Sequence, residues 1–181
     1  AMTNYGHNTT EDTIYIPNPN DKTDMSVIAP FYDRDDIKKV VLEQGVTSTG
    51  NYAFYKCDGI TEVIFPETGF TRLGAGSFRK CTFLEEITIP DTVTYYGGHA
   101  FMDDASLKQV NIPDGIETIS NNTFTGCESL TEIEIPDSVT SIAAQAFWKC
   151  YNLEKVNIPD GVTEIPKDCF NKCYALKEIE I

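Results

Sequence analysis

Phenylalanine recurs at an almost constant interval through most of the chain. Successive members are 24 residues apart once and 23 residues apart four times, at Phe54, Phe78, Phe101, Phe124, Phe147 and Phe170. Six residues after each phenylalanine stands an apolar residue, and three residues later an apolar pair of the form Val/Ile-x-Ile/Phe begins. Such self-similarity at a fixed period predicts an array of stacked structural units, each about 23 residues long.

The pattern inside one unit predicts a strand, a turn and a short helical turn. In the pair Ile133 and Ile135 the period is two, so both side chains face the same side of a strand. Pro136 follows and ends that strand, because proline cannot donate a ladder hydrogen bond. The three-residue spacing of Phe147, Cys150 and Leu153 predicts one short helical turn. Since a single coil cannot bury its own apolar stripe, we expect an α/β repeat solenoid with a parallel sheet.

The N-terminal region contains a degenerate copy of the same unit. Residues 14–17 repeat the pattern of residues 133–136, but Ile14 lies 26 residues before Val40, so this copy is longer. We therefore predict a capping repeat within residues 1–36 and six regular coils over residues 37–181. Eight strands are expected from Ile14 to Ile181. The chain stops at the end of a strand without a second polar cap, so we expect either that the native protein continues, which we favour, or that this end pairs with another molecule.

The repeat pattern resembles a known family. Phe-x-x-Cys-x-x-Leu-x-x-Val/Ile-x-Ile-Pro-x-x-Val-x-x-Ile is similar to the BspA-like class of leucine-rich repeats, named after a bacterial surface antigen. The resemblance covers residues 37–181 clearly and residues 11–36 weakly, with Asp104 in the cysteine column as a departure. It implies a right-handed superhelix with a curved parallel sheet on the concave face, in a secreted or cell-surface protein. The family is linked to adhesion and has no catalytic residues, so the resemblance implies a chain that is not an enzyme.

The charge of the chain narrows the choice of partner. The 28 acidic and 14 basic residues give a formal net charge of -14, which repels phosphate backbones and anionic lipid. Nucleic acid and membrane surfaces are therefore poor candidates, and no stretch resembles a signal peptide or a membrane span. The acidity suits a basic protein or cations, although many proteins are acidic without any such partner.

Cysteines and aspartates each form a column, with one member in most coils. Five cysteines share the apolar column, and we expect buried, reduced thiols, because the coil spacing is wide for a disulfide and no zinc-ligand spacing occurs. Each aspartate directly follows a proline, and the preference of aspartate for turns explains this position. The alternative is that the stacked carboxylates of the column bind calcium together. No cofactor is expected. The aspartates are Asp91, Asp114, Asp137 and Asp160, and the cysteines are Cys57, Cys81, Cys127, Cys150 and Cys173, with Cys169 in a neighbouring column.

The strand residues that face away from the core are the candidate ligand site. In a solenoid they line the concave face, where a ligand contacts several coils at once. The acidic surplus in the C-terminal half indicates a basic protein ligand. The predicted site residues are Lys39, Glu62, Glu86, Gln109, Asn111, Glu132, Glu134, Lys155, Asn157, Glu178 and Glu180.

A basic column next to the cysteines is expected off the concave face. It contains Lys56, Lys80, Lys149 and Lys172. The neighbouring aromatic residues form either an exposed patch or contacts between coils. These are Tyr55, Trp148, Tyr151 and Tyr174.

The sequence favours a non-catalytic recognition or adhesion module that binds a protein ligand, such as a host or extracellular-matrix protein. Two alternatives stay open. One is a glycan-binding module that uses the amides and aromatics Gln109, Asn111, Asn157, Tyr151 and Trp148. The other is a passive spacer in a larger surface protein.

Overall fold

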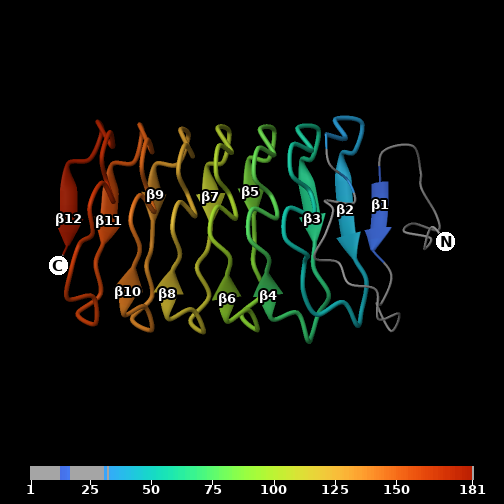
Figure 1. The fold of residues 1–181 in the computed structure, drawn as a ribbon, viewed down its shortest axis with the longest axis horizontal. Helices are drawn as coiled ribbons and strands as arrows, with labels where there is room; N and C mark the ends of the chain where they lie inside the picture. The colour runs from blue at the N-terminus through green and yellow to red at the C-terminus, as the bar shows by residue number, and fades with distance from the viewer. Residues whose placement is uncertain (1–12, 17–30, 32, 181) are drawn as a thin grey trace.

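The computed structural model describes residues 13–16, 31 and 33–180. Its coils stack side by side along one long axis (Figure 1). One face carries the strands that the repeat predicts, and all pairings are parallel. These strands are β1 (Thr13–Ile16), β2 (Lys39–Leu42), β3 (Glu62–Ile64), β5 (Glu86–Ile87), β7 (Gln109–Val110), β9 (Glu132–Ile133), β11 (Lys155–Asn157) and β12 (Glu178–Glu180).

The strand face confirms the predicted strand positions and their register. Ile14 pairs with Val40, the alignment that the 26-residue spacing predicts. The face is divided into three sheets, β1-β2-β3, β5-β7 and β9-β11-β12. The division of the chain into a capping segment of residues 1–36 and six coils stays a prediction, because most of residues 1–36 lie outside the described residues.

A second set of strands, which the sequence analysis did not predict, runs along the other side of four coils. It consists of β4 (Arg72–Leu73), β6 (Tyr95–Tyr96), β8 (Thr118–Ile119) and β10 (Ser141–Ile142), paired as β4-β6 and β8-β10. In Figure 1 these arrows point opposite to those of the first face. The second residue of each strand is buried, so a short apolar repeat after the proline forms a second wall of the core.

The segment expected to form a short helical turn forms consecutive tight turns instead. No helix occurs in the described part of the chain. Gln145 and Lys149 have φ of 60° and 62°, which no right-handed helix contains. Backbone bonds close turns from Cys150 N–H to the Phe147 carbonyl and from Leu153 N–H to the Cys150 carbonyl, at 3.2 and 3.1 Å. Alternate amides donate to the next coil instead, as Lys149 does to Asn171 at 2.9 Å.

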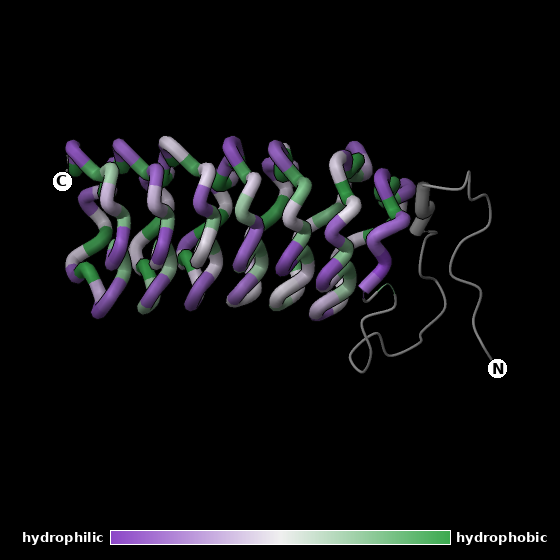
Figure 2. The backbone as a smooth tube through the Cα atoms, turned by 90° about the horizontal axis from the view of Figure 1, so that it is seen from above, coloured by the Kyte–Doolittle hydropathy of each residue, from purple (hydrophilic) through white to green (hydrophobic). Residues whose placement is uncertain are grey.

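A stack of seven phenylalanine rings runs through the core. It comprises Phe31 and the six repeat phenylalanines, and neighbouring ring centroids lie between 5.2 and 6.0 Å apart, with interplanar angles of at most 17°. Hydrophobic and hydrophilic segments alternate within every coil (Figure 2). Phe31 stacks on Phe54 with ring centroids 5.6 Å apart and therefore belongs to the same repeated column.

The cysteine column packs directly behind the phenylalanine stack. Each thiol donates to the carbonyl of a phenylalanine in the preceding coil, for example from Cys81 to Phe54 at 3.3 Å and from Cys150 to Phe124 at 3.2 Å. All six cysteines are free, five are buried and Cys173 is partly exposed. This agrees with the expectation of reduced thiols that pack as small hydrophobic residues.

Candidate functional site

An open hollow of about 1190 Å³ lies on the strand face, over β5, β7, β9 and β11. Seven of the eleven predicted site residues line it. Residues that the sequence analysis did not assign to the site complete its walls, including the aspartates that follow two strands. The seven are Glu86, Gln109, Asn111, Glu132, Glu134, Lys155 and Asn157, and the added ones include Thr88, Lys108, Asp114, Thr131, Asp137 and Ser138.

Strand alternation points these side chains outward. Along residues 132–135, Glu132 and Glu134 are exposed, whereas Ile133 and Ile135 are 5% and 1% exposed. The period of two therefore places the apolar residues in the core and both carboxylates in the hollow. The hollow also crosses the junction between two of the sheets, since β7 and β9 are not paired.

Two asparagine side chains in the hollow form hydrogen bonds with the backbone of the preceding coil. The Asn111 amide donates to the Ile89 carbonyl at 2.8 Å, and its oxygen accepts the Ile89 N–H at 2.7 Å. Asn157 makes the same pair of bonds with Ile135, at 2.7 and 2.9 Å. Both side chains thus continue the strand pairing where the ladder would otherwise stop. Sequence reasoning gave them only a binding role, because nothing local indicates a partner one coil away.

The hollow carries a surplus of negative charge. Its walls hold five carboxylates and two ammonium groups, which leaves a formal charge of -3. The ammonium of Lys108 lies 2.7 Å from Glu85, and that of Lys155 lies 3.9 Å from Glu178, so acids outside the hollow partly neutralise both. The carboxylates are those of Glu86, Asp114, Glu132, Glu134 and Asp137.

The other four predicted site residues lie outside the hollow. Lys39 and Glu62 form an ion pair of 2.8 Å between β2 and β3. Glu178 lies on β12 beside Lys155, and Glu180 pairs with Asn157 through the backbone, while its side chain is outside the described part. In the sheet register Lys155 lies between Glu132 and Glu178, so a basic residue separates the carboxylates of the hollow from those of β12.

The aspartate column takes part in turns. Ile116 N–H donates to the Pro113 carbonyl at 3.0 Å, and Val139 N–H donates to the Pro136 carbonyl at 3.0 Å, so Asp114 and Asp137 each sit inside a closed four-residue turn. Within the described ranges, no three histidine, cysteine or acidic side chains are grouped so that they could hold a metal ion. Nor does any helix of this part have the length and apolar character needed to cross a membrane.

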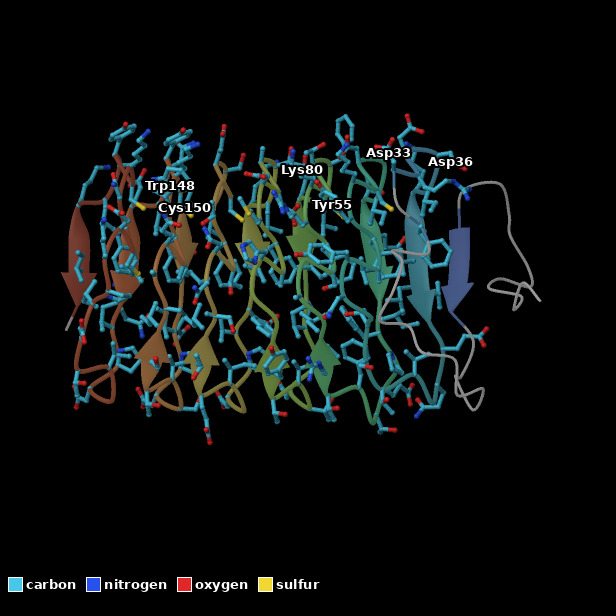
Figure 3. The ribbon with its side chains drawn as sticks, in the orientation of Figure 1. Asp33, Asp36, Tyr55, Lys80, Trp148 and Cys150 are labelled. Carbon is cyan, nitrogen blue, oxygen red and sulfur yellow. The ribbon has the colours of Figure 1, made fainter. Side chains whose placement is uncertain are left out.

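The predicted basic column lies along the edge formed by the tight turns. Figure 3 labels Tyr55, Lys80 and Trp148 in the upper half of the molecule, away from the lower ends of the coils. Lys56 and Lys149 both have a positive φ, of 59° and 62°, so the column marks one repeated position in the turns. The structure shows the expected contact between coils, since Tyr151 stacks on Tyr174. Of the four aromatic residues only Tyr174 is exposed, and the other three are partly buried.

Comparison with known proteins identifies the type of repeat. The pattern described as a BspA type Leucine rich repeat region (6 copies) matches residues 13–117 and 97–181. A comparison with curated protein sequences gives no match.

Three solved structures are similar to this chain. A leucine rich cell surface protein from Faecalibacterium prausnitzii matches with a TM-score of 0.53 and 23% identity, over 84% of this chain and 62% of that protein. A leucine rich repeat protein from T. pallidum matches with a TM-score of 0.60 and 23% identity, over 78% of this chain and 77% of that protein. A leucine-rich repeat protein from Bacteroides ovatus matches with a TM-score of 0.51 and 20% identity, over 96% of this chain and 64% of that protein. The chain therefore spans less than two thirds of the first and third proteins, and the likeness concerns the fold alone.

Proposed function

Since this chain belongs to the BspA-type leucine-rich-repeat family, we propose that it is a non-catalytic recognition module that binds a basic protein ligand in the strand-face hollow. The observation that carries the proposal is the hollow itself, which crosses four strands and has a formal charge of -3. A stable protein interface buries about 800 Å² on each partner. A single coil offers too little area for that, whereas a ligand in this hollow reaches several coils.

Location at a bacterial cell surface is part of the same proposal. The matched F. prausnitzii structure is described as a cell surface protein. A surface module meets proteins of a host or of an extracellular matrix, and adhesion would follow from binding one of them. The net charge of -14 supports the choice of a basic ligand, because it steers cationic partners toward the chain.

Peptides of opposite charge provide the first test. Immobilised protein is exposed to an oligolysine and to an oligoglutamate peptide, and binding is measured by surface plasmon resonance at low and high salt. We expect oligolysine alone to bind, with an association rate that falls as salt screens the hollow. Basic extracellular-matrix proteins are then tested in the same way.

Paired variants locate the binding surface. Glu132→Gln with Glu134→Gln removes two carboxylates from the hollow, and we expect the dissociation constant to rise about tenfold, or about 1.4 kcal/mol. The matched control, Glu117→Gln with Glu164→Gln, removes two exposed carboxylates outside the hollow. Equal weakening by both pairs would assign the binding to net charge alone. Absence of binding by every basic probe would favour a passive spacer.

A further inference from the structure

A cluster of lysine and aromatic side chains lies on the turn edge at the last two coils, away from the strand-face hollow. We call it the turn-edge patch. Its lysines and tyrosines repeat from one coil to the next at two positions, whereas Trp148 occupies a third position that is Asn171 in the following coil. The patch consists of Trp148, Lys149, Tyr151, Lys172 and Tyr174, and Figure 3 labels Trp148 at this edge.

Two ammonium groups converge on one indole ring in this patch. The Nζ of Lys149 lies 4.3 Å from the Trp148 ring centroid, and that of Lys172 lies 5.8 Å from it. Both lysines have a positive φ, 62° and 67°, and Lys149 N–H donates to Asn171 in the next coil at 2.9 Å. The two turns therefore have the same backbone shape and send both side chains toward the same ring.

The lysines of this column differ in their counter-charges. Lys56 lies 3.8 Å from Asp33, whereas Lys80 makes no ion pair within the described residues. In the two coils between Lys80 and Lys149 the position holds Asp103 and Gly126. For Lys149 and Lys172, no ion pair occurs with any described residue. Two cations held side by side repel each other, so a bound anion would lower the energy of this arrangement.

The two tyrosines of the patch indicate which class of anionic ligand fits it. Tyr151 and Tyr174 stack with centroids 5.7 Å apart and planes 3° from parallel. Because the two rings cover each other, a nucleic-acid base has no room to insert between them. The 76% exposure of Tyr174 leaves its ring and hydroxyl free to meet C–H faces and hydroxyl groups.

We propose that the turn-edge patch binds a polysaccharide that carries sulfate or carboxylate groups. The ammonium groups of Lys149 and Lys172 pair with the anionic substituents, and the tyrosines pack against the sugar rings. Because the cations and the tyrosines repeat once per coil, a polymer with regularly repeated anionic groups meets both coils at once. The site is separate from the hollow and does not depend on the function proposed for it.

Binding of dextran sulfate tests the proposal, with neutral dextran, polyglutamate and oligothymidylate as comparison ligands. Affinities are measured by biolayer interferometry at near-physiological salt, where weak long-range attraction is screened. We expect dextran sulfate to bind at least about tenfold more tightly than each of the others. Failure of dextran sulfate to bind would overturn the proposal. Equal or tighter binding of neutral dextran, polyglutamate or oligothymidylate would overturn it as well.

Matched variants separate the patch from the charge of the whole chain. Lys149→Gln with Lys172→Gln is expected to weaken dextran sulfate binding about tenfold or more. The control, Lys56→Gln with Lys108→Gln, removes the same charge from lysines that already face Asp33 and Glu85 and should change the affinity by less than about twofold.

A third variant tests the aromatic contact. Tyr174→Thr copies Thr82, which takes this position in an earlier coil, and should weaken binding several-fold. An equal loss in the lysine control, or an unchanged affinity in Tyr174→Thr, would contradict the proposed contacts. Circular dichroism melts of each variant confirm that it is folded, so that a lost affinity is not a lost fold.

Discussion

The rings of Phe124 and Phe147 stack with centroids 5.4 Å apart and planes 12° from parallel, and neither ring is exposed. Each ring also stacks on another neighbour, so truncation removes contacts with two coils at once. We expect Phe124→Ala or Phe147→Ala to lower the free energy of unfolding by about 3–5 kcal/mol. Denaturant melts measure this. Phe83→Ala, at a position that is 61% exposed, is the control and should change little.

Asp104 replaces cysteine in the buried column and should make stability depend on pH. Its Oδ1 accepts the Cys81 N–H at 2.7 Å, but Oδ2 has no hydrogen-bond partner in the described structure. Burial raises the pKa of this carboxyl well above its usual value, with Asp103 adding to the effect. The folded state therefore holds a proton that the unfolded state releases near pH 3.9. Stability falls as pH rises from about 3.9 toward the raised folded-state pKa.

Replacement of this carboxyl tests the pH effect. Asp104→Cys restores the column residue, and we expect it to raise stability by about 1–3 kcal/mol at neutral pH, because it removes an unsatisfied buried group. The gain should shrink as pH falls toward 4. Thermal melts across this pH range measure it, with Asp104→Asn as the uncharged isosteric control. A gain in stability that is the same at every pH would contradict a raised pKa of the Asp104 carboxyl in the folded state.

The cysteines should differ in reactivity even though all are free. Burial raises the pKa of Cys57 and Cys169 to about 12, and burial also raises the pKa of Cys81 and Cys127. The hydrogen bond between the thiols of Cys150 and Cys173 lowers the pKa of Cys173.

We therefore expect Cys173, which is partly exposed, to be alkylated first, since the thiolate is the reactive form. Peptide mass spectrometry after a short exposure to iodoacetamide identifies the modified residue. The remaining cysteines should react only after denaturation. Rapid modification of Cys81 or Cys127 in the native protein would show that the column is open to solvent.

The paired hydrogen bonds of Asn157 predict a structural cost that is independent of binding. Asn157→Ala leaves the N–H and the carbonyl of Ile135 without these partners, so we expect a loss of about 1–3 kcal/mol in the free energy of unfolding. Gln109→Ala, at an exposed strand position in the same hollow, should change it by less than about 0.5 kcal/mol. Chemical denaturation of the two variants side by side measures the difference between their free energies of unfolding. Similar losses in both would show that the hydrogen bonds of Asn157 add no stability beyond that of an exposed strand residue.

Part of the candidate site follows from the sequence alone. The outward direction of Glu132 and Glu134 is fixed by the alternation with Ile133 and Ile135, and both line the hollow. The role of Asn157 was not predictable, because its partner Ile135 lies 22 residues earlier in the chain. The contribution of Asp137 to the hollow was also missed. Its place after Pro136 indicates a turn, and only the stacking of coils brings that turn beside the strands.

The sequence by itself determined the period, the strand positions and the buried columns. These follow from burial of apolar residues that recur every 23 residues, and this requirement acts in every coil alike. Only the tertiary structure decided the form of the segments between the strands. The spacing of Phe147, Cys150 and Leu153 suits a helical turn and a series of tight turns equally. The tight turns allow alternate amides, such as that of Lys149, to donate to the next coil, whereas a helix would bond them within its own coil.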